Sequence, residues 1–425
     1  MSADRSASEI GGPGTHFDVA IIGGGMVGAS LALALASSGL SLLLVEGAAP
    51  DSAVQPSFDD RTTALGNASR RIFQALGVWP AIAPQAAAIR TIHVSDAGRF
   101  GFARLRAEEQ GVDAFGYVVS NRVIGAALWG HLKTLSSLTL RVPTRPEAVQ
   151  IAPEGVRFTV TAETGEREEF AARLIVAADG AHSSVRAAAG IEADVEDYDQ
   201  MAIVTNVTSD RPQDATAYER FTPSGPLAVL PLYDGSYGVV WTARPDNAAR
   251  LLSLGDEEFL RELQIRFGWR AGRFTRVGRR ASYPLKLSRA TTTTATRTVL
   301  IGNAAQALHP VAGQGFNLGL RDAAMLAEVI ANPGGDVGWD VGAPALLQRF
   351  SEWRAADRSG VVRFTDSLVK MFGDSRPGIA TIRNLGLLLF DLAPPAKSAL
   401  ARVSAGFGGR TPRLARGLSL REASP

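Results

Sequence analysis

The stretch VAIIGGGMVGASLALALASSGLSLLLVE, residues 19–46, decides the fold class of this chain. Its first 27 residues carry no charge, which by length alone would allow a transmembrane helix. Glycines interrupt the run and divide it into a β-branched segment, a glycine turn, an Ala/Leu-rich segment over about 26–38 and an apolar segment over 40–45. This order predicts a strand, a turn, a helix and a second strand, all buried in a parallel sheet.

The turn has the glycine spacing G-x-G-x-x-G, which is typical of a dinucleotide-binding loop between a strand and a helix. Gly23 permits the tight turn, Gly25 lets the main chain approach a pyrophosphate, and Gly28 lets helix and strand pack closely. The start of the helix offers N–H groups and a partial positive charge to the phosphates. The residues that we expect around the phosphates are Gly23, Gly25, Met26, Val27 and Gly28.

An acidic residue stands where this motif needs one. Glu46 ends the second strand, 18 residues after Gly28, and its carboxylate can accept a hydrogen bond from a ribose hydroxyl. The fingerprint does not separate FAD from NAD. No second G-x-G-x-x-G lies between a strand-like and a helix-like segment, so a separate domain for NAD(P)H is not indicated.

Two further segments each follow a buried strand with a polar or glycine-rich loop. They read LIVAADGAHSSVR at residues 174–186 and VLIGNAAQALHPVAGQGFNLGLRD at residues 299–322. With these three motifs in this order, the chain resembles the single-component FAD-dependent aromatic hydroxylases, which share the fold of para-hydroxybenzoate hydroxylase. In that class the third motif begins Gly-Asp, whereas here it is Gly302-Asn303, so a neutral amide stands where a carboxylate usually meets the flavin ribityl chain.

Within this class the chain is most similar to the ubiquinone-biosynthesis hydroxylases, over roughly residues 17–400. That family commonly has the asparagine at the third motif. The stretches that carry the similarity are GNAAQALHPVAGQGFNLGLRD (302–322), DDRTTALGNASRRIFQALGVW (59–79), GYVVSNRVIGAALW (116–129) and ERFTPSGPLAVLPL (219–232).

The resemblance implies an FAD-dependent, NAD(P)H-consuming enzyme that hydroxylates a polyprenylated phenol on the way to ubiquinone. The oxygen atom would come from O₂ through a C4a-hydroperoxyflavin. Three other functions stay open. They are a related monooxygenase of a soluble phenol or secondary metabolite, a non-catalytic FAD-bound subunit of a biosynthetic complex, and a reductase of a prenyl chain.

The resemblance also assigns residues to the cofactor. The start of a helix over about 315–331 would point at the flavin N1/C2=O edge, where its dipole favours the anionic reduced ring, and Asn317 could donate to the same edge. The further residues that we expect at the FAD are Arg61, Arg122, Asp179, Gly180, Gly302, Asn303, Gly313, Gln314 and Gly315.

No firm catalytic side chain follows from the sequence, and the candidates are His309 and Arg220. His309 either lies near the reacting centre or is a loop residue bonded to the backbone. Arg186 either binds a pyrophosphate of the reductant or pairs with a surface acid. The residues that we expect in the wall of the substrate pocket are Arg220, Phe221 and Pro226.

Composition supports a globular enzyme that depends on a cofactor. The 425 residues are 46% hydrophobic and 20% charged, which is ordinary for a folded enzyme. The 44 basic and 42 acidic residues give a net charge of +2, too weak to suggest nucleic-acid binding. The chain has no cysteine, which excludes disulfides, thiol nucleophiles and iron–sulfur clusters. We also expect no metal site.

We expect an α/β fold with a discontinuous, Rossmann-like FAD-binding domain over residues 16–69, 116–194 and 290–375. An inserted α+β substrate domain, built on a mostly antiparallel sheet, would take residues 70–115 and 195–289. Strand-like runs stand at Thr91–Val94, Met201–Val207, Leu227–Leu232 and Tyr237–Thr242, and a helix-like run at Asp256–Phe267.

The two ends of the chain differ from its middle. Residues 1–16 lack the charged-then-apolar order of a signal peptide, so we expect a short disordered lead and a cytoplasmic protein. Residues 376–425 form a predicted basic, helical tail, in which residues 379–425 hold seven basic and two acidic side chains. This tail either lies on an anionic membrane surface, as part of a peripheral enzyme or complex, or packs on the FAD domain.

Overall fold

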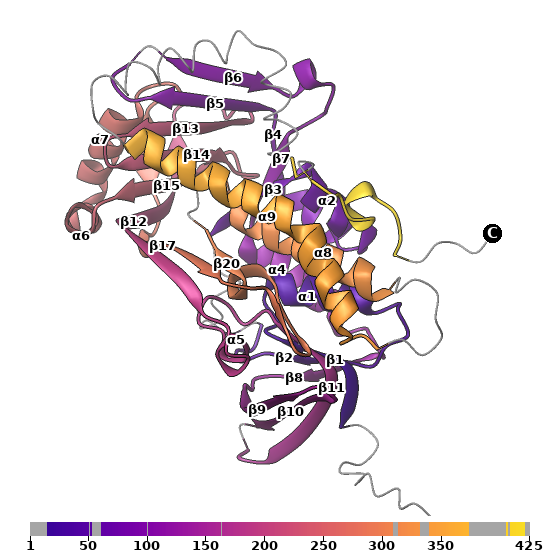
Figure 1. The fold of residues 1–425 in the computed structure, drawn as a ribbon. Helices are drawn as coiled ribbons and strands as arrows, with labels where there is room; N and C mark the ends of the chain where they lie inside the picture. Colours follow the sequence, from indigo (N-terminus) through magenta and orange to yellow (C-terminus); the bar gives the residue numbers. More distant parts are fainter. Residues whose placement is uncertain are drawn as a thin grey trace, which may run out of the picture.

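A computed structural model describes residues 15–50, 52, 61–99, 101–162, 164–308, 313–331, 340–373, 405–406 and 409–420 (Figure 1). Three sheets organise the described chain, and long helices fill the space between them. His309 and most of the predicted tail lie outside the described residues.

The first sheet has a parallel centre in the order β19-β11-β1-β2-β8. β18 pairs antiparallel with β19, and β9 and β10 extend β11 as an antiparallel layer. The strands are β1 (His16–Ile22), β2 (Leu42–Val45), β8 (Leu138–Arg141), β9 (Pro146–Ala152), β10 (Gly155–Thr161), β11 (Arg167–Ala177), β18 (Thr294–Ala295) and β19 (Thr298–Leu300). The predicted strand, turn, helix and strand over residues 19–46 is therefore confirmed.

Helices cover one face of this parallel centre and bury its main apolar core. Leu31 and Leu35 of α1, Phe73 of α2, Leu128 of α4 and Leu326 of α8 all belong to this core. The helices are α1 (Met26–Leu35), α2 (Asn67–Ala75), α3 (Trp79–Ile82), α4 (Asn121–Leu132) and α8 (Gln314–Ala331). α1 ends one turn earlier than predicted, and α8 begins one residue earlier.

The second sheet is mostly antiparallel, in the order β20-β17-β12-β15-β14-β13-β5-β6, with β16 on β12. Its strands are β5 (Thr91–Asp96), β6 (Phe102–Arg106), β12 (Ala193–Ser209), β13 (Thr216–Thr222), β14 (Gly225–Pro231), β15 (Tyr237–Ala243), β16 (Phe274–Val277), β17 (Ala281–Ala290) and β20 (Gln306–Ala307). The four strand-like runs predicted from the sequence are confirmed as parts of β5, β12, β14 and β15.

Two helices cover one side of the second sheet, away from α8 (Figure 1). They are α6 (Pro245–Ser253) and α7 (Asp256–Phe267), and the bounds of α7 are the predicted ones. Trp241 of the sheet packs edge-on against Phe259 of α7, with ring centroids 5.7 Å apart. This contact and its neighbours bury one face of the sheet completely, so the opposite face is the one that meets the rest of the molecule.

A small third sheet joins the two large ones. It pairs β3 (Thr62–Gly66) and β4 (Ala87–Ile89) with β7 (Gly116–Ser120) in the order β3-β7-β4. Ile89 and Val118 of this sheet form an apolar cluster with Ala217 of β13, and Ala64 of β3 packs against the same cluster. The third sheet therefore faces the uncovered side of the second.

The helix α9 (Pro344–Gly373) runs across the molecule between the second and the first sheet (Figure 1). Arg354 of α9 has no exposed surface and bonds Asp322 of α8 at 2.7 Å as well as Asp357. Arg321 of α8 bonds Asp357 at 2.9 Å. Burial alone would raise the pKa of Asp357, but Arg321 and Arg354 hold that pKa below its ordinary value. The packing of α8 on α9 thus depends on a buried, charge-paired cluster.

The described part of the tail packs on the helices beside the parallel sheet. The Ala68 N–H donates to the carbonyl of Ala405 at 2.9 Å, and Leu414 and Ala415 lie in the main core. Arg410 stacks on the ring of Trp353 at 3.3 Å. Residues 405–406 and 409–420 therefore fit the packed interpretation of the tail, and they hold a short 3-10 helix, η5 (Leu414–Arg416).

Some predicted domain boundaries fall inside elements. Residue 70 lies within α2, residue 195 within β12 and residue 290 at the end of β17, so the division into domains stays a prediction. Of the described helices, none combines the length and the apolar composition needed to cross a membrane. The remaining short elements are η1 (Ala83–Gln85), η2 (Glu108–Gln110), α5 (Ser184–Ala188) and η3 (Gly302–Ala304).

Candidate functional site

The loops that carry the three sequence motifs meet at one edge of the parallel sheet. β2 and β11 flank β1, so the chain leaves β1 on one side and returns on the other, and ligands bind at such a switch in strand order. Main-chain hydrogen bonds fix the strand ends, from Gly23 N to the carbonyl of Val45 at 2.8 Å and from Ala178 N to that of Ile22 at 2.7 Å. Ile301 N similarly donates to the carbonyl of Ala177 at 3.0 Å.

The glycine loop is shaped by contacts that leave no room for side chains. Gly23 has φ +102°, and a Cβ there would lie 2.4 Å from the carbonyl oxygen of Ala178. A Cβ on Gly28 would lie 1.9 Å from the oxygen of Gly23. Gly25 precedes α1 in an extended conformation, with no side-chain cap and no acidic residue in the first turn. The start of α1, with Met26 and Val27, therefore keeps N–H groups for an anion.

Glu46 stands beside this loop at the end of β2 and is 9% exposed. Its Oε2 accepts from the Gly24 N–H at 2.6 Å and its Oε1 from the Ala48 N–H at 2.9 Å. These two bonds tie the carboxylate to the glycine loop, and its contact with a ribose hydroxyl stays a prediction. Trp129 of α4 also holds the loop, since its Nε1 donates to the carbonyl of Gly24 at 3.0 Å. The sequence analysis missed Trp129, because it lies 105 residues from its partner.

Asp179 follows β11 and has one carboxylate oxygen in use. Its Oδ2 accepts from the Ser184 N–H at 2.8 Å and from the Ser184 hydroxyl at 3.1 Å. Its Oδ1 is buried and has no hydrogen-bond partner within the described chain, which is costly unless a ligand supplies a donor. This oxygen, next to Gly180 and to the cradle at Gly23 and Gly28, fits a bound dinucleotide.

Arg186 ties the second motif to the third. Its guanidinium donates to the carbonyls of Ala181, at 2.8 Å, and of Ala304, at 3.0 Å. Arg186 therefore bridges two loops, and its contact with the reductant stays a prediction. Asn303, in the loop that Arg186 holds, is exposed.

The third motif packs α8 directly on the first. Gly302 has φ +58°, and a Cβ on it would lie 3.2 Å from a methyl group of Val27. A Cβ on Gly319 of α8 would lie 2.9 Å from the Cα of Gly302. Two glycines in contact thus bring the first part of α8, including the buried Gln314 and its neighbour Gly315, to the edge where α1 begins.

Asn317 joins the start of α8 to β3 by hydrogen bonds. Its Nδ2 donates to the carbonyls of Ala64, at 2.8 Å, and Gly313, at 2.7 Å. Its Oδ1 accepts from Gly66 N and from the Ser69 hydroxyl. All four hydrogen-bonding positions of the amide are filled within the chain, so Asn317 positions Gly313 and β3, and its bond to the flavin edge stays a prediction.

The two predicted FAD arginines lie at different places. Arg61 stacks its guanidinium over the ring of Tyr283, 4.6 Å from the centroid, where β3 meets the second sheet. Arg122 is exposed in the first turn of α4. Their contact with a cofactor stays a prediction, as does the role of His309.

Arg220 bonds to the helices that cover the second sheet, and its role as a wall or catalytic residue stays a prediction. Its Nε donates to the carbonyl of Arg266 in α7 at 2.9 Å, and its neighbour Tyr218 packs edge-on against Phe267 of α7. Side chains alternate along a strand, so Arg220 belongs to the face that the helices cover. Burial, followed by the nearby Arg270, lowers the pKa of Arg220.

The alternation places Glu219 on the uncovered face, with Ala217 and Phe221 on either side of it. Ala217 packs with the cluster that meets Ala64 of β3, and Ala64 backs Gly313, whose Cβ would lie 3.1 Å from that of Ala64. Glu219 therefore lies on the face of the second sheet that meets this cluster. The predicted wall residue Pro226 pairs with Phe221 and shares this face.

Glu219 is a functional candidate that the sequence analysis did not single out. The Glu219 side chain is largely buried and stays partly accessible. Burial raises the pKa of Glu219 from 4.5 to about 7. A carboxyl group that changes charge near neutral pH can take up or release a proton during catalysis.

Comparison with known proteins agrees with this geometry. Residues 16–365 match the model of the FAD binding domain family. The chain is 38% identical to the ubiquinone hydroxylase UbiL of Rhodospirillum rubrum, covering 95% of this chain and 93% of the relative. It is 32% identical to the 3-demethoxyubiquinol 3-hydroxylase of Escherichia coli, covering 92% and 98%.

A relative from animals and a solved structure extend the comparison. The mitochondrial ubiquinone biosynthesis monooxygenase COQ6 of Homo sapiens is 29% identical, with 90% of this chain and 91% of the relative covered. The fold matches the crystal structure of p-nitrophenol 4-monooxygenase PnpA from Pseudomonas putida with a TM-score of 0.74 at 20% identity, covering 93% and 99%. The chain belongs to the ubiquinone-biosynthesis FAD hydroxylases and is an FAD-dependent monooxygenase.

Proposed function

We propose that this monooxygenase uses NAD(P)H and O₂ to hydroxylate the ring of a polyprenylated phenol in ubiquinone biosynthesis. The observation that carries the proposal is the 38% identity, over nearly its whole length, to a ubiquinone hydroxylase. Two features support it: the glycine loop has the close contacts of a dinucleotide-binding turn, and Glu219 of the second sheet is an ionisable group with a pKa of about 7.

In this proposal, different residues of the chain bind different parts of the FAD. The N–H groups from Gly25 to Gly28 bind the pyrophosphate, Glu46 accepts from a ribose hydroxyl, and Asp179 Oδ1 accepts from a hydroxyl of the FAD. The residues that bind the flavin end are Gly180, Gly302, Asn303, Gly313, Gln314 and Gly315. Bound flavin, once reduced by NAD(P)H, reacts with O₂ and supplies the oxygen atom.

Glu219 handles the proton of the substrate in this proposal. A phenol ring becomes a stronger nucleophile as its hydroxyl loses a proton, and that proton moves from the phenol oxygen to Glu219 while the O–H electron pair stays on the oxygen. Phe221 and Pro226 give the same face an apolar wall against the ring. Arg186 and Asn317 act only by holding loops in place.

Deletion of the gene in its host tests the substrate class. Mass spectrometry of extracted quinones should show less ubiquinone and an accumulated polyprenylated precursor that lacks one ring oxygen. The wild-type gene should restore the profile, whereas a Gly28→Val gene should not, because the side chain would displace Gly23 from the phosphate loop. A deletion strain with normal ubiquinone and no precursor would contradict the proposal.

The cofactor assignment has its own test on purified protein. Glu46→Ala should weaken FAD binding at least tenfold in a fluorescence titration, and Glu46→Gln should weaken it less, because an amide oxygen still accepts one hydrogen bond. An FAD affinity unchanged in both variants would show that Glu46 does not contact the ribose.

A further inference from the structure

An arginine that the sequence analysis did not single out lies beside the proposed ribose site. Glu46 N donates to the carbonyl of Arg141 at 3.0 Å, and Thr144 N donates to the carbonyl of Glu46 at 2.8 Å. The Thr144 hydroxyl donates in turn to the carbonyl of Thr161 at 2.8 Å. The turn after β8 is thus fixed on both sides, and its next residue, Arg145, is held next to the end of β2.

The side chain of Arg145 runs over Gly47, the residue that follows Glu46. A Cβ on Gly47 would lie 2.7 Å from the Nε of Arg145 and 3.0 Å from its Cγ. The φ of Gly47 is not positive, so its backbone conformation does not require a glycine. What this glycine provides is the space that the arginine occupies.

Arg145 is available to a ligand. It is exposed and has no ion-pair or hydrogen-bond partner in the described part of the chain. Arg141, at the start of the same turn, bonds Glu168 at 2.6 Å and stacks on the ring of Phe170. Arg141 therefore joins neighbouring strands, whereas the planar face and the N–H groups of Arg145 are not used by the protein itself.

We propose that Arg145 binds the adenosine part of FAD. In dinucleotide-binding folds, groups that neighbour the ribose-binding acid contact the adenosine. Arg145 neighbours Glu46 through the main chain of Thr144 and through its contact with Gly47. A guanidinium is planar and stacks on the face of an aromatic ring, which adenine offers. The inference rests on the proposed contact of Glu46 with the ribose.

Titration of the full-length, FAD-free protein with FAD and with ADP tests this role. Arg145→Ala should weaken the binding of both ligands by the same factor, about tenfold, because ADP carries the adenosine and no flavin. The midpoint of thermal unfolding of the FAD-free protein should stay that of the wild type, because the Arg145 side chain makes no polar contact with the described chain. An unchanged affinity for FAD or for ADP would overturn the proposal.

Gly47→Ala tests the same contact from the other side. Its methyl group would displace Arg145, so FAD binding should weaken about as much as in Arg145→Ala. The double variant should bind FAD as either single variant does, within about twofold, because both changes remove one contact. Additive losses would overturn the proposal, since Gly47 and Arg145 would then affect FAD binding separately.

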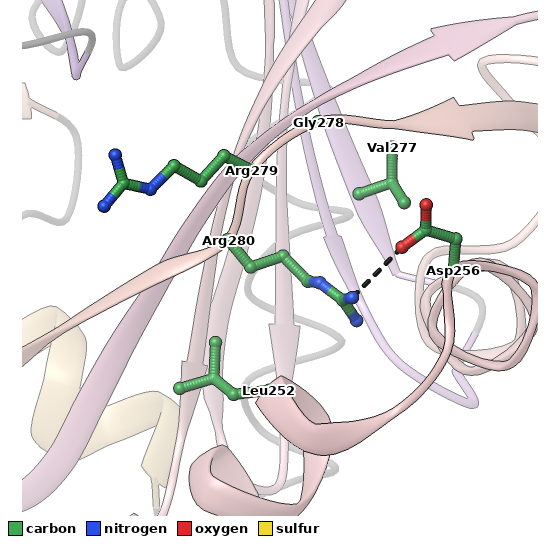
Figure 2. A pocket seen from close by; sticks show the side chains of 6 residues that line it. All are labelled: Leu252, Asp256, Val277, Gly278, Arg279 and Arg280. Atoms are coloured by element: carbon green, nitrogen blue, oxygen red, sulfur yellow. Dashed lines mark hydrogen bonds and ion pairs between the residues drawn. The ribbon is translucent and has the colours of Figure 1, made fainter.

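The matched control for charge is Arg279→Ala. Arg279 is an exposed arginine at the hollow beside β16, which is also lined by Leu252, Asp256, Val277, Gly278 and Arg280. Figure 2 shows Arg279 pointing away from Asp256, which Arg280 bonds at 3.0 Å. This variant removes the same charge and should change the FAD affinity less than twofold. A loss equal to that of Arg145→Ala would contradict a specific contact.

Glu46→Ala, titrated in parallel, separates this inference from the proposed function. If Glu46→Ala weakens FAD binding and Arg145→Ala does not, the role of Arg145 is wrong and the ribose contact of Glu46 stands. If neither variant weakens it, the placement of the ribose beside Glu46 is wrong as well.

Discussion

The desolvated carboxyl group of Glu219 should make the stability of this protein depend on pH. Burial raises its pKa from 4.5 to about 7, so the folded state binds the proton more tightly than the unfolded state does. The stabilisation is complete below pH 4.5 and is lost as the pH rises through 7. The shift of about 2.5 units corresponds to roughly 3.4 kcal/mol at 1.36 kcal/mol per unit, and partial exposure of the side chain reduces this to about 2–3 kcal/mol.

Glu219→Gln removes this ionisation and keeps the size of the side chain. We expect the variant and the wild type to have similar free energies of unfolding at pH 4.5, and the variant to be about 2–3 kcal/mol more stable at pH 8. Guanidinium unfolding of both proteins, followed by circular dichroism at the two pH values, measures the difference.

The matched control is Glu257→Gln, which changes an exposed glutamate of α7 and should alter the free energy of unfolding by less than about 0.5 kcal/mol at either pH. A Glu219→Gln variant that is no more stabilised at pH 8 than at pH 4.5 would refute the reasoning. The carboxyl group would then be hydrated, and its role as a proton acceptor would lose its physical basis.

Three further predictions concern the cofactor loops and the helix packing. Gly28→Ala places a Cβ 1.9 Å from the Gly23 oxygen, so FAD binding measured by fluorescence titration should weaken at least a hundredfold; near-normal affinity would mean that the loop does not bind the phosphates. Asp179→Ala should weaken FAD binding at least tenfold and Asp179→Asn should weaken it less, because the amide keeps an oxygen that can replace the unpaired Oδ1. If calorimetry gives both variants the FAD affinity of the wild type, Oδ1 does not contact the FAD. Arg354→Met should cost about 3–5 kcal/mol in thermal unfolding, because it removes the 2.7 Å partner of the buried Asp322 and one of the two arginines that bond Asp357, and a loss below 1 kcal/mol would show that the cluster is not essential to packing.

The phosphate loop could be predicted from the sequence because its glycines are required by close main-chain contacts. Gly23 and Gly28 stand where any side chain would collide with the main chain, and their spacing is set by one turn between a strand and a helix. The same holds for the strand and helix order over residues 19–46, where apolar runs and turn residues agree with each other.

The sequence did not predict which face of the second sheet each side chain of β13 occupies. Around Glu219 both faces of β13 carry apolar residues, Tyr218 on one and Ala217 and Phe221 on the other. Without a clean alternation, a shift of one residue exchanges the two faces. This is why Arg220 was expected in the pocket and Glu219 was overlooked.

The hydrogen-bond partners of polar side chains could not be predicted from the sequence either. Asn317 and Arg186 lie in the predicted motifs, but some of their hydrogen-bond partners lie far away in the sequence, 253 residues for Asn317 and Ala64 and 118 for Arg186 and Ala304. Such bonds depend on where the loops meet in space. A motif can therefore name the residues of a site without telling which ones contact a ligand and which ones hold the loops.

Labelled oxygen tests the central claim most directly. Purified, FAD-loaded protein, given NADH or NADPH and a polyprenylated phenol under ¹⁸O₂, should yield a product whose ring carries one ¹⁸O atom by mass spectrometry. A product labelled from water, or FAD-loaded protein that consumes neither reductant nor oxygen with this substrate, would contradict the proposed hydroxylation.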